Sequence, residues 1–170
     1  PDFVILSFIL ISINYWLIRP QEFFSRSSHG LVALVKEISM RDTFYLLGVD
    51  IGGTNVKFGL VDRQGKIFAS GLANVSFDGY KTPIMTTVIR ELKAFLADSL
   101  TQNRIASELG EHGVRPSGIA VSATGQIDTA KGLVAGSCGH LPGWSLTPVQ
   151  EIFERELGYP TLVANDANCM

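Results

Sequence analysis

The chain has 170 residues, of which 46% are hydrophobic, and a formal net charge of −2. That length is enough for one domain with a hydrophobic core. The sequence has no basic block, so we expect no nucleic-acid partner. Cys138 and Cys169 lie far apart and lack the spacing of metal ligands, a pattern typical of free thiols in a reducing compartment. We therefore expect a cytoplasmic protein.

Residues 1–40 form an apolar extension that differs from the rest of the chain. The run from Phe3 to Ile18 is almost continuously apolar but shorter than the roughly 20 residues that a membrane helix usually needs. One interpretation is a translated leader, with Met40 as the true start and Lys36-Glu37 encoded by a ribosome-binding sequence. The other is an anchor helix. We expect no membrane association unless residues 3–18 are a real anchor.

The first two predicted strands flank a glycine turn. Tyr45 to Val49 is a short apolar run typical of a buried strand, and the alternation from Asn55 to Leu60 predicts a second strand. Between them, Gly52 and Gly53 allow backbone geometries that other residues avoid, and they leave space for a ligand.

This turn predicts a binding site for phosphate groups. Successive backbone N–H groups form a nest for anionic oxygens, and Thr54 adds a hydroxyl. Asp50, at the mouth of the turn, is suited to hold a hydrated Mg²⁺ ion, since Mg²⁺ commonly accompanies nucleotide phosphates. The alternative is an ordinary hairpin with a turn-capping aspartate. Lys57 alternates onto the same face as Asn55, where it either assists or faces solvent.

The next segments predict a third strand and then a long helix. Lys66 to Ala73 follows a turn and completes an antiparallel meander. From Ile84 the apolar spacing becomes helical, and one helix is predicted to continue towards Leu109. The predicted buried stripe of this helix consists of Ile84, Val88, Leu92, Phe95, Leu96 and Leu100.

The remaining segments alternate between strand and helix. Gly118 to Ser122 and Thr161 to Ala164 are predicted buried strands. Between them, Thr147 is predicted to cap a helix that begins at Pro148 and carries Gln150 as its capping-box residue. Three meander strands followed by helix, strand, helix and strand indicate a mixed α/β domain with helices packed on the sheet. Such sheets bind ligands at their strand ends.

Polar residues follow the last two predicted strands. Asp166 either caps a helix that begins there or accepts a proton from a substrate hydroxyl as a general base. Asn165 beside it is suited to bind neighbouring hydroxyls, so the pair favours polyhydroxylated ligands such as sugars. Gly125 would let the backbone approach a ligand that Gln126 binds, although a plain loop is the alternative there.

Four segments occur in a recognisable order: Asp50-Ile51-Gly52-Gly53-Thr54-Asn55, the stretch from Gly118 to Asp128, Leu141-Pro142-Gly143-Trp144, and Asn165-Asp166-Ala167-Asn168. Together they resemble the ROK family of sugar kinases and sugar-responsive repressors. His140 and Ala164 stand where the family usually has an asparagine and a glutamate.

The resemblance implies an actin-like ATPase (ribonuclease-H-like) fold of two lobes, with sugar and ATP in the cleft between them. The implied activity is ATP-dependent phosphorylation of a hexose or N-acetylhexosamine hydroxyl, with Asp166 as the general base. The implied sugar ligands are Gly125, Gln126 and Asn165. The implied phosphate-binding residues are Asp50, Gly52, Gly53, Thr54 and Lys57, with Asp50 acting on Mg²⁺ through water.

By the same resemblance, residues 41–170 correspond to the N-terminal lobe alone. The family's structural zinc is expected only in the second lobe, and a homodimer is compatible with the full-length protein. We therefore expect these 170 residues alone not to turn over sugar. One alternative is the sugar-sensing lobe of a repressor, although the short apolar extension lacks the basic residues of a DNA-binding domain. Another is a non-catalytic sugar-binding remnant.

Overall fold

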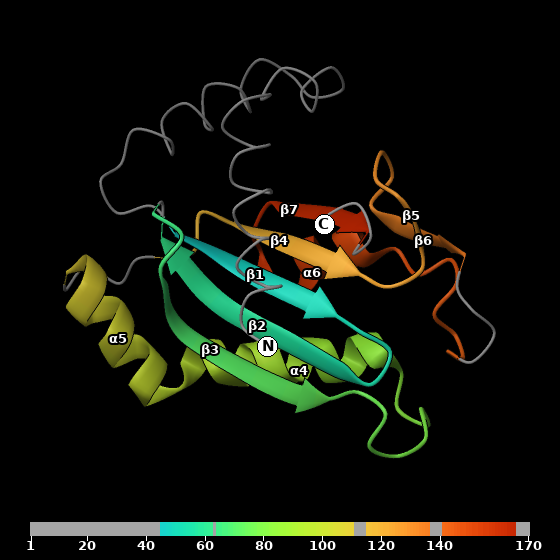
Figure 1. Cartoon of the computed structure of the whole chain (residues 1–170), viewed down its shortest axis with the longest axis horizontal. Helices are drawn as coiled ribbons and strands as arrows, with labels where there is room; N and C mark the ends of the chain where they lie inside the picture. The colour runs from blue at the N-terminus through green and yellow to red at the C-terminus, as the bar shows by residue number, and fades with distance from the viewer. Residues whose placement is uncertain (1–44, 63, 111–114, 137–140, 166–170) are drawn as a thin grey trace.

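A five-stranded mixed sheet forms the centre of the fold (Figure 1). This computed structural model describes residues 45–62, 64–110, 115–136 and 141–165. In spatial order the strands are β3-β2-β1-β4-β7. Their bounds are β1 Tyr45–Ile51, β2 Asn55–Asp62, β3 Ile67–Asn74, β4 Gly118–Ala123 and β7 Thr161–Asn165. The apolar run of residues 3–18 and Asp166 lie outside the described residues.

The strands divide into an antiparallel meander and a parallel set that share β1. β1 pairs antiparallel with β2, which pairs antiparallel with β3, so the predicted meander is confirmed. On its other side β1 pairs parallel with β4, and β4 pairs parallel with β7. The parallel strands need crossover connections because their ends cannot be joined by a tight turn. Helices lie in both connections.

The helices cover one face of the sheet, where α4 (Ile84–Ala97) and α6 (Val149–Leu157) lie side by side (Figure 1). Alternate residues of β1 are buried in the same core as Leu92 of α4 and Phe153 of α6. This follows from the period of a strand, which sends every second side chain to the same face. None of the helices in the described ranges is long and apolar enough to cross a bilayer.

The predicted helix from Ile84 towards Leu109 is wrong as a single element. Asp98 adopts an extended backbone with ψ 135°, which ends α4 and precedes α5 (Ser99–Leu109). Its Oδ2 accepts a hydrogen bond of 3.0 Å from the Thr101 N–H, the contact of a helix N-cap. Leu100 follows the break and its side chain is 70% exposed, so it does not belong to the predicted buried stripe.

The predicted capping box of α6 is also wrong. The helix begins after Pro148, and no side chain caps its first turn. The Thr147 hydroxyl instead donates to the Gly143 carbonyl oxygen at 3.2 Å, and the Gln150 amide donates to Glu154 Oε1 at 3.1 Å. The helix ends at Gly158, which adopts the left-handed conformation with φ 75°, the usual C-terminal residue of a helix.

Candidate functional site

The carboxyl ends of the three parallel strands meet at one edge of the sheet. Their last residues are in register across the sheet, so that Ile51 pairs with Ala123 and Ala123 pairs with Asn165. One position earlier, Asp50 pairs with Ser122. The glycine turn, the Gly125 loop and Asn165, which lie far apart in the sequence, therefore follow neighbouring strand ends. This is the edge at which open α/β sheets place their ligands.

Asp50 and Lys57 are directly opposite each other on β1 and β2. Directly opposed residues of an antiparallel pair project to the same face of the sheet. Both residues are partly buried, so Lys57 is only partly exposed to solvent. The structure thus brings one carboxylate and one ammonium group to the same side of the glycine turn.

Gly52 and Gly53 fit the turn because they have no side chain. Neither has a positive φ, so the expectation that they use geometries closed to other residues is wrong. A Cβ atom on Gly52 would lie 3.1 Å from the Asn55 carbonyl oxygen, and one on Gly53 would lie 3.3 Å from Cδ2 of Leu141. Both distances are tighter than ordinary van der Waals contact. A side chain at either position would be crowded, because the turn folds tightly on itself and against Leu141.

The backbone of this turn keeps donors available. The Gly52 N–H donates to the Asn55 carbonyl at 2.9 Å, and the Thr54 carbonyl accepts from the Val75 N–H at 2.8 Å. Within the described ranges, the N–H groups of Gly53 and Thr54 make no hydrogen bond. Two successive free donors are the elements of an anion-binding nest. The Thr54 side chain is exposed beside them.

The Gly125 loop is fixed at both of its neighbouring strands. The Thr124 N–H donates to the Ile51 carbonyl at 3.0 Å, and the Asn165 side-chain amide donates to the Gly125 carbonyl. Gly125 has a φ of 108°, a region that side-chain-bearing residues rarely adopt, so glycine is required for the shape of this loop. Asn165 thus contacts the loop that was predicted with it as a sugar ligand.

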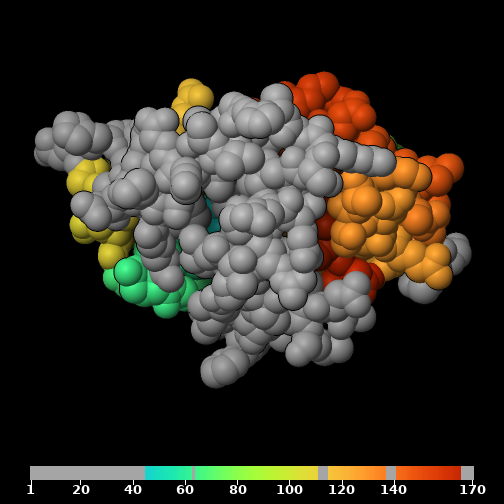
Figure 2. Space-filling view, turned by 90° about the horizontal axis from the view of Figure 1, so that it is seen from above, coloured from blue at the N-terminus to red at the C-terminus, as the bar shows by residue number. Residues whose placement is uncertain are grey.

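Gln126 begins a hairpin that the sequence analysis did not predict, formed by β5 (Gln126–Asp128) and β6 (Leu133–Gly136). The hairpin lies at the surface at one end of the molecule (Figure 2). The Gln126 side chain is exposed and lies close to Gly136, where an added Cβ would be 3.0 Å from its Oε1. Gln126 therefore borders the site from the hairpin side.

Three residues hold the predicted loops through contacts that the sequence did not predict. Tyr80 donates its hydroxyl to the Gly53 carbonyl at 2.8 Å, and the Trp144 indole N–H donates to the Thr124 carbonyl at 2.8 Å. Leu141 packs against Gly53. Trp144 is buried in the core, and its indole N–H has the additional role of holding the loop. For Tyr80 no motif or spacing in the sequence signals the contact.

The loop that carries Tyr80 is itself braced. Asp78 Oδ2 accepts hydrogen bonds from the Thr82 hydroxyl at 2.7 Å and from the Thr82 N–H at 2.9 Å. The hydrogen bond from the Thr82 hydroxyl is the main cause that lowers the pKa of the Asp78 carboxyl. Between these residues, Gly79 and Tyr80 both have positive φ angles, 68° and 62°. The sharp reversal aims the tyrosine hydroxyl at the glycine turn.

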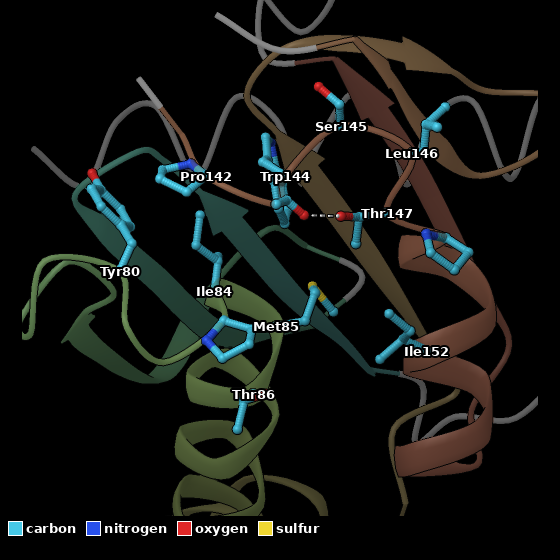
Figure 3. A pocket seen from close by; sticks show the side chains of 13 residues that line it. Tyr80, Ile84, Met85, Thr86, Pro142, Trp144, Ser145, Leu146, Thr147 and Ile152 are labelled. Atoms are coloured by element: carbon cyan, nitrogen blue, oxygen red, sulfur yellow. Dashed lines mark hydrogen bonds between the residues drawn. The ribbon is translucent and has the colours of Figure 1, made fainter. Parts of the chain in front are cut away.

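A groove of about 620 Å³ lies next to this site, between the first turn of α4 and the segment from Pro142 to Pro148 (Figure 3). Tyr80 and Trp144 line it, whereas none of the predicted site residues in the described ranges does. The groove is therefore adjacent to the predicted site and does not coincide with it.

The donor set around Asp50 restricts what metal it can hold. Among the described residues, no three His, Cys, Asp or Glu side chains come close enough to bind one metal ion together. A single carboxylate fits Mg²⁺, which keeps several of its waters and takes other ligands from substrate phosphates. It does not fit a metal that needs several protein ligands. The predicted catalytic Asp166 directly follows Asn165 but lies outside the described residues.

Comparisons with known proteins agree with this architecture. A sequence model of the ROK family matches residues 46–170. A beta-glucoside kinase from Listeria monocytogenes is 32% identical over 123 residues, which are 71% of this chain and 34% of the kinase. The chain thus spans 34% of the length of that relative.

Two solved structures share the fold. A ROK family glucokinase from Streptomyces griseus, in complex with glucose and AMPPNP, has a TM-score of 0.52 at 23% identity, covering 73% of this chain and 34% of that one. A ROK family transcriptional regulator, homologous to the Escherichia coli MLC protein, has a TM-score of 0.55 at 17% identity, covering 73% and 28%. The mixed sheet is therefore the sheet of an actin-like ATPase domain.

Proposed function

Because the chain belongs to the ROK family, we propose that the whole protein transfers the γ-phosphoryl group of ATP to a hydroxyl of a hexose or N-acetylhexosamine. One observation carries the proposal: three parallel strand ends in register bring the Asp50 turn, the Gly125 loop and Asn165 to one edge of the sheet. The similarity to a named sugar kinase at 32% identity supports it. ATP is abundant in the cytoplasm, the compartment proposed for the reaction.

In this proposal the residues at the edge divide between the two substrates. Gly125, Gln126 and Asn165 bind the sugar. The N–H groups of Gly53 and Thr54, beside Gly52, bind phosphate oxygens, and Lys57 adds a positive charge on the same side. Asp50 would hold Mg²⁺ through one of its waters, and the ion would neutralise phosphate charge when bound with the nucleotide.

Asp166 is proposed as the general base. In the sequence it directly follows Asn165, the last residue of β7 and a proposed sugar ligand. Its carboxylate accepts the proton of the sugar hydroxyl as that oxygen bonds to the γ-phosphorus. The bond from phosphorus to the bridging oxygen breaks on the opposite side, and ADP leaves. Positioning of the two reactants contributes most of the acceleration in such a transfer.

The test is an assay of ADP release by the full-length protein with ATP and each of glucose, mannose, N-acetylmannosamine, N-acetylglucosamine and a β-glucoside. We expect at least one sugar to be phosphorylated. Asp166→Asn should lower kcat by about 10²–10⁴-fold, the usual contribution of a general base, and leave the sugar Kd close to that of the wild type. Glu151→Gln, which removes an exposed carboxylate of α6, is the matched control and should retain full activity.

Two different results would contradict the kinase proposal and the role of Asp166, respectively. Sugar binding without any ATP-dependent turnover would favour the sugar-sensing function, which the repressor alternative requires. Full activity of Asp166→Asn would leave the kinase proposal intact and remove Asp166 from its role as the base.

A further inference from the structure

The turn from Leu141 to Trp144 contacts both loops of the candidate site. At one end, Cδ2 of Leu141 lies 3.3 Å from the position that a Cβ on Gly53 would take. The Leu141 side chain therefore packs directly on the backbone of the glycine turn. At the other end, the Trp144 indole N–H donates to the Thr124 carbonyl at 2.8 Å, in the loop that leads into Gly125. No motif assigned to sugar or phosphate binding includes either side chain.

This turn is rigid enough to transmit a displacement. Leu141 is 6% exposed and Trp144 is 2% exposed, and the Trp144 N–H donates to the Leu141 carbonyl at 3.3 Å within the turn. Trp144 is among the largest fully buried side chains of the described residues. Because buried side chains pack at the density of organic crystals, neither end of the turn can move without moving its contacts.

Each loop is also held by a second contact, so the turn acts between two restrained backbones. The Gly53 carbonyl accepts the Tyr80 hydroxyl at 2.8 Å, while Leu141 covers the Cα of the same residue. The Gly125 carbonyl accepts the Asn165 amide, while Trp144 holds the preceding carbonyl. Figure 3 shows Tyr80 and Trp144 on opposite sides of Pro142.

We propose that the Leu141–Trp144 turn couples the two loops of the site. Sugar bound at the Gly125 loop increases the affinity of the glycine turn for nucleotide phosphates, and bound phosphates increase the affinity of the Gly125 loop for sugar. Leu141 and Trp144 are positioning residues that contact neither substrate. Ordering one loop fixes the turn, and the fixed turn orders the other loop, so the second ligand loses less conformational freedom when it binds. By linkage, each ligand changes the affinity for the other by the same factor. This inference rests on the proposed function.

The first arm of the test needs no ligand. Amide hydrogen exchange of the full-length protein reports the Val75 N–H, which donates to the Thr54 carbonyl of the glycine turn, and the Thr124 N–H of the Gly125 loop. Trp144→Phe keeps a buried aromatic ring but removes the indole donor. We expect both amides to exchange faster by about fivefold, on the scale of one lost hydrogen bond. Faster exchange at Thr124 alone would overturn the coupling, because the loosening would then be confined to the Gly125 loop and would not reach the glycine turn.

The second arm measures the coupling factor, defined as the Kd of AMPPNP without glucose divided by its Kd with saturating glucose. We expect about fivefold or more for the wild-type protein and a value within about twofold of one for Trp144→Phe. Leu141→Ala, which releases the turn at its other end, should give the same loss. Ile105→Ala, a buried control in α5, should lower the melting temperature and leave the factor unchanged.

The outcomes separate this inference from the proposed function. Binding of both probes with no coupling, or full coupling in both variants, would overturn the inference while the kinase proposal stands. If the wild-type protein phosphorylates none of the tested sugars, the proposed function fails, and the exchange of Val75 and Thr124 still decides whether the Leu141–Trp144 turn links the two loops.

Discussion

Tyr80 delivers its hydroxyl to Gly53 from a backbone conformation that side-chain-bearing residues rarely adopt. Its φ is 62°, and it follows Gly79 at 68°. A non-glycine residue at positive φ carries strain that the surrounding contacts must hold in place. Here those contacts are the hydrogen bond to Gly53 and the Asp78–Thr82 brace. Strain of this kind beside a proposed ligand-binding turn leads us to expect that the position of the phenol matters for the site.

We therefore predict that Tyr80→Phe raises the KM for ATP about two- to tenfold and leaves the KM for the sugar nearly unchanged. The substitution keeps the ring in place but leaves the Gly53 carbonyl without its donor, a loss on the order of 1 kcal/mol. Steady-state kinetics of the full-length protein measure both constants. Equal changes in the two constants would mean that Tyr80 supports the fold in general and does not act on the phosphate turn in particular.

At the scale of elements, the break between α4 and α5 depends on one side chain. Asp98 ends the first helix with an extended backbone and caps the second through its bond with Thr101. We predict that Asp98→Ala lowers the free energy of unfolding by about 1 kcal/mol, the typical loss for an N-cap aspartate. Urea unfolding of the full-length protein measures it, with the exposed Ser99→Ala as the control that should change stability by less than about 0.5 kcal/mol. A loss that is equal in both variants would contradict the capping role.

The elements that the sequence predicted are those whose signal is local. β1, β2, β3, β4 and β7 are apolar or alternating runs bounded by turn residues, and all five are confirmed with ends shifted by a few residues at most. Predictions from local signals were wrong where a side chain makes a different hydrogen bond from the one its position suggests. Thr147 has the composition of an N-cap, but its hydroxyl bonds to Gly143, and Asp98 interrupts an apolar helical pattern that continues on both sides of it.

The candidate site also has a part that the sequence predicted and a part that it did not. Glycines and polar residues at strand ends marked the Asp50 turn, the Gly125 loop and Asn165, and the structure brings these three to one edge. The supporting contacts were not readable, because they join residues that are distant in the chain. The bond from Tyr80 to Gly53 spans 27 positions and that from Trp144 to Thr124 spans 20. Such contacts follow from how the elements pack, which the sequence pattern alone does not specify.

At the scale of the whole molecule, the described edge is one side of the proposed cleft. The chain spans 34% of the length of the beta-glucoside kinase that it matches. We predict that residues 1–170 alone do not phosphorylate any sugar that the full-length protein phosphorylates. Phosphoryl transfer depends on holding both substrates in line and on excluding water from them, and a single open edge does neither. Parallel ADP-release assays of the two proteins at equal concentration measure this, and turnover by the shorter chain would contradict it.

The central position of β1 also has a consequence for how the chain acquires its fold during synthesis. The ribosome releases the N-terminal end first, so β2 and β3 can pair with β1 as soon as they emerge. The opposite edge of β1 pairs with Gly118–Ala123, which is synthesised only after both α4 and α5. Throughout that interval the nascent chain carries an unpaired strand edge, the feature that templates aggregation. The strand that bears Asp50 thus keeps one edge unpaired until β4 has been made, and dependence on chaperones during translation is expected to be greatest in that interval.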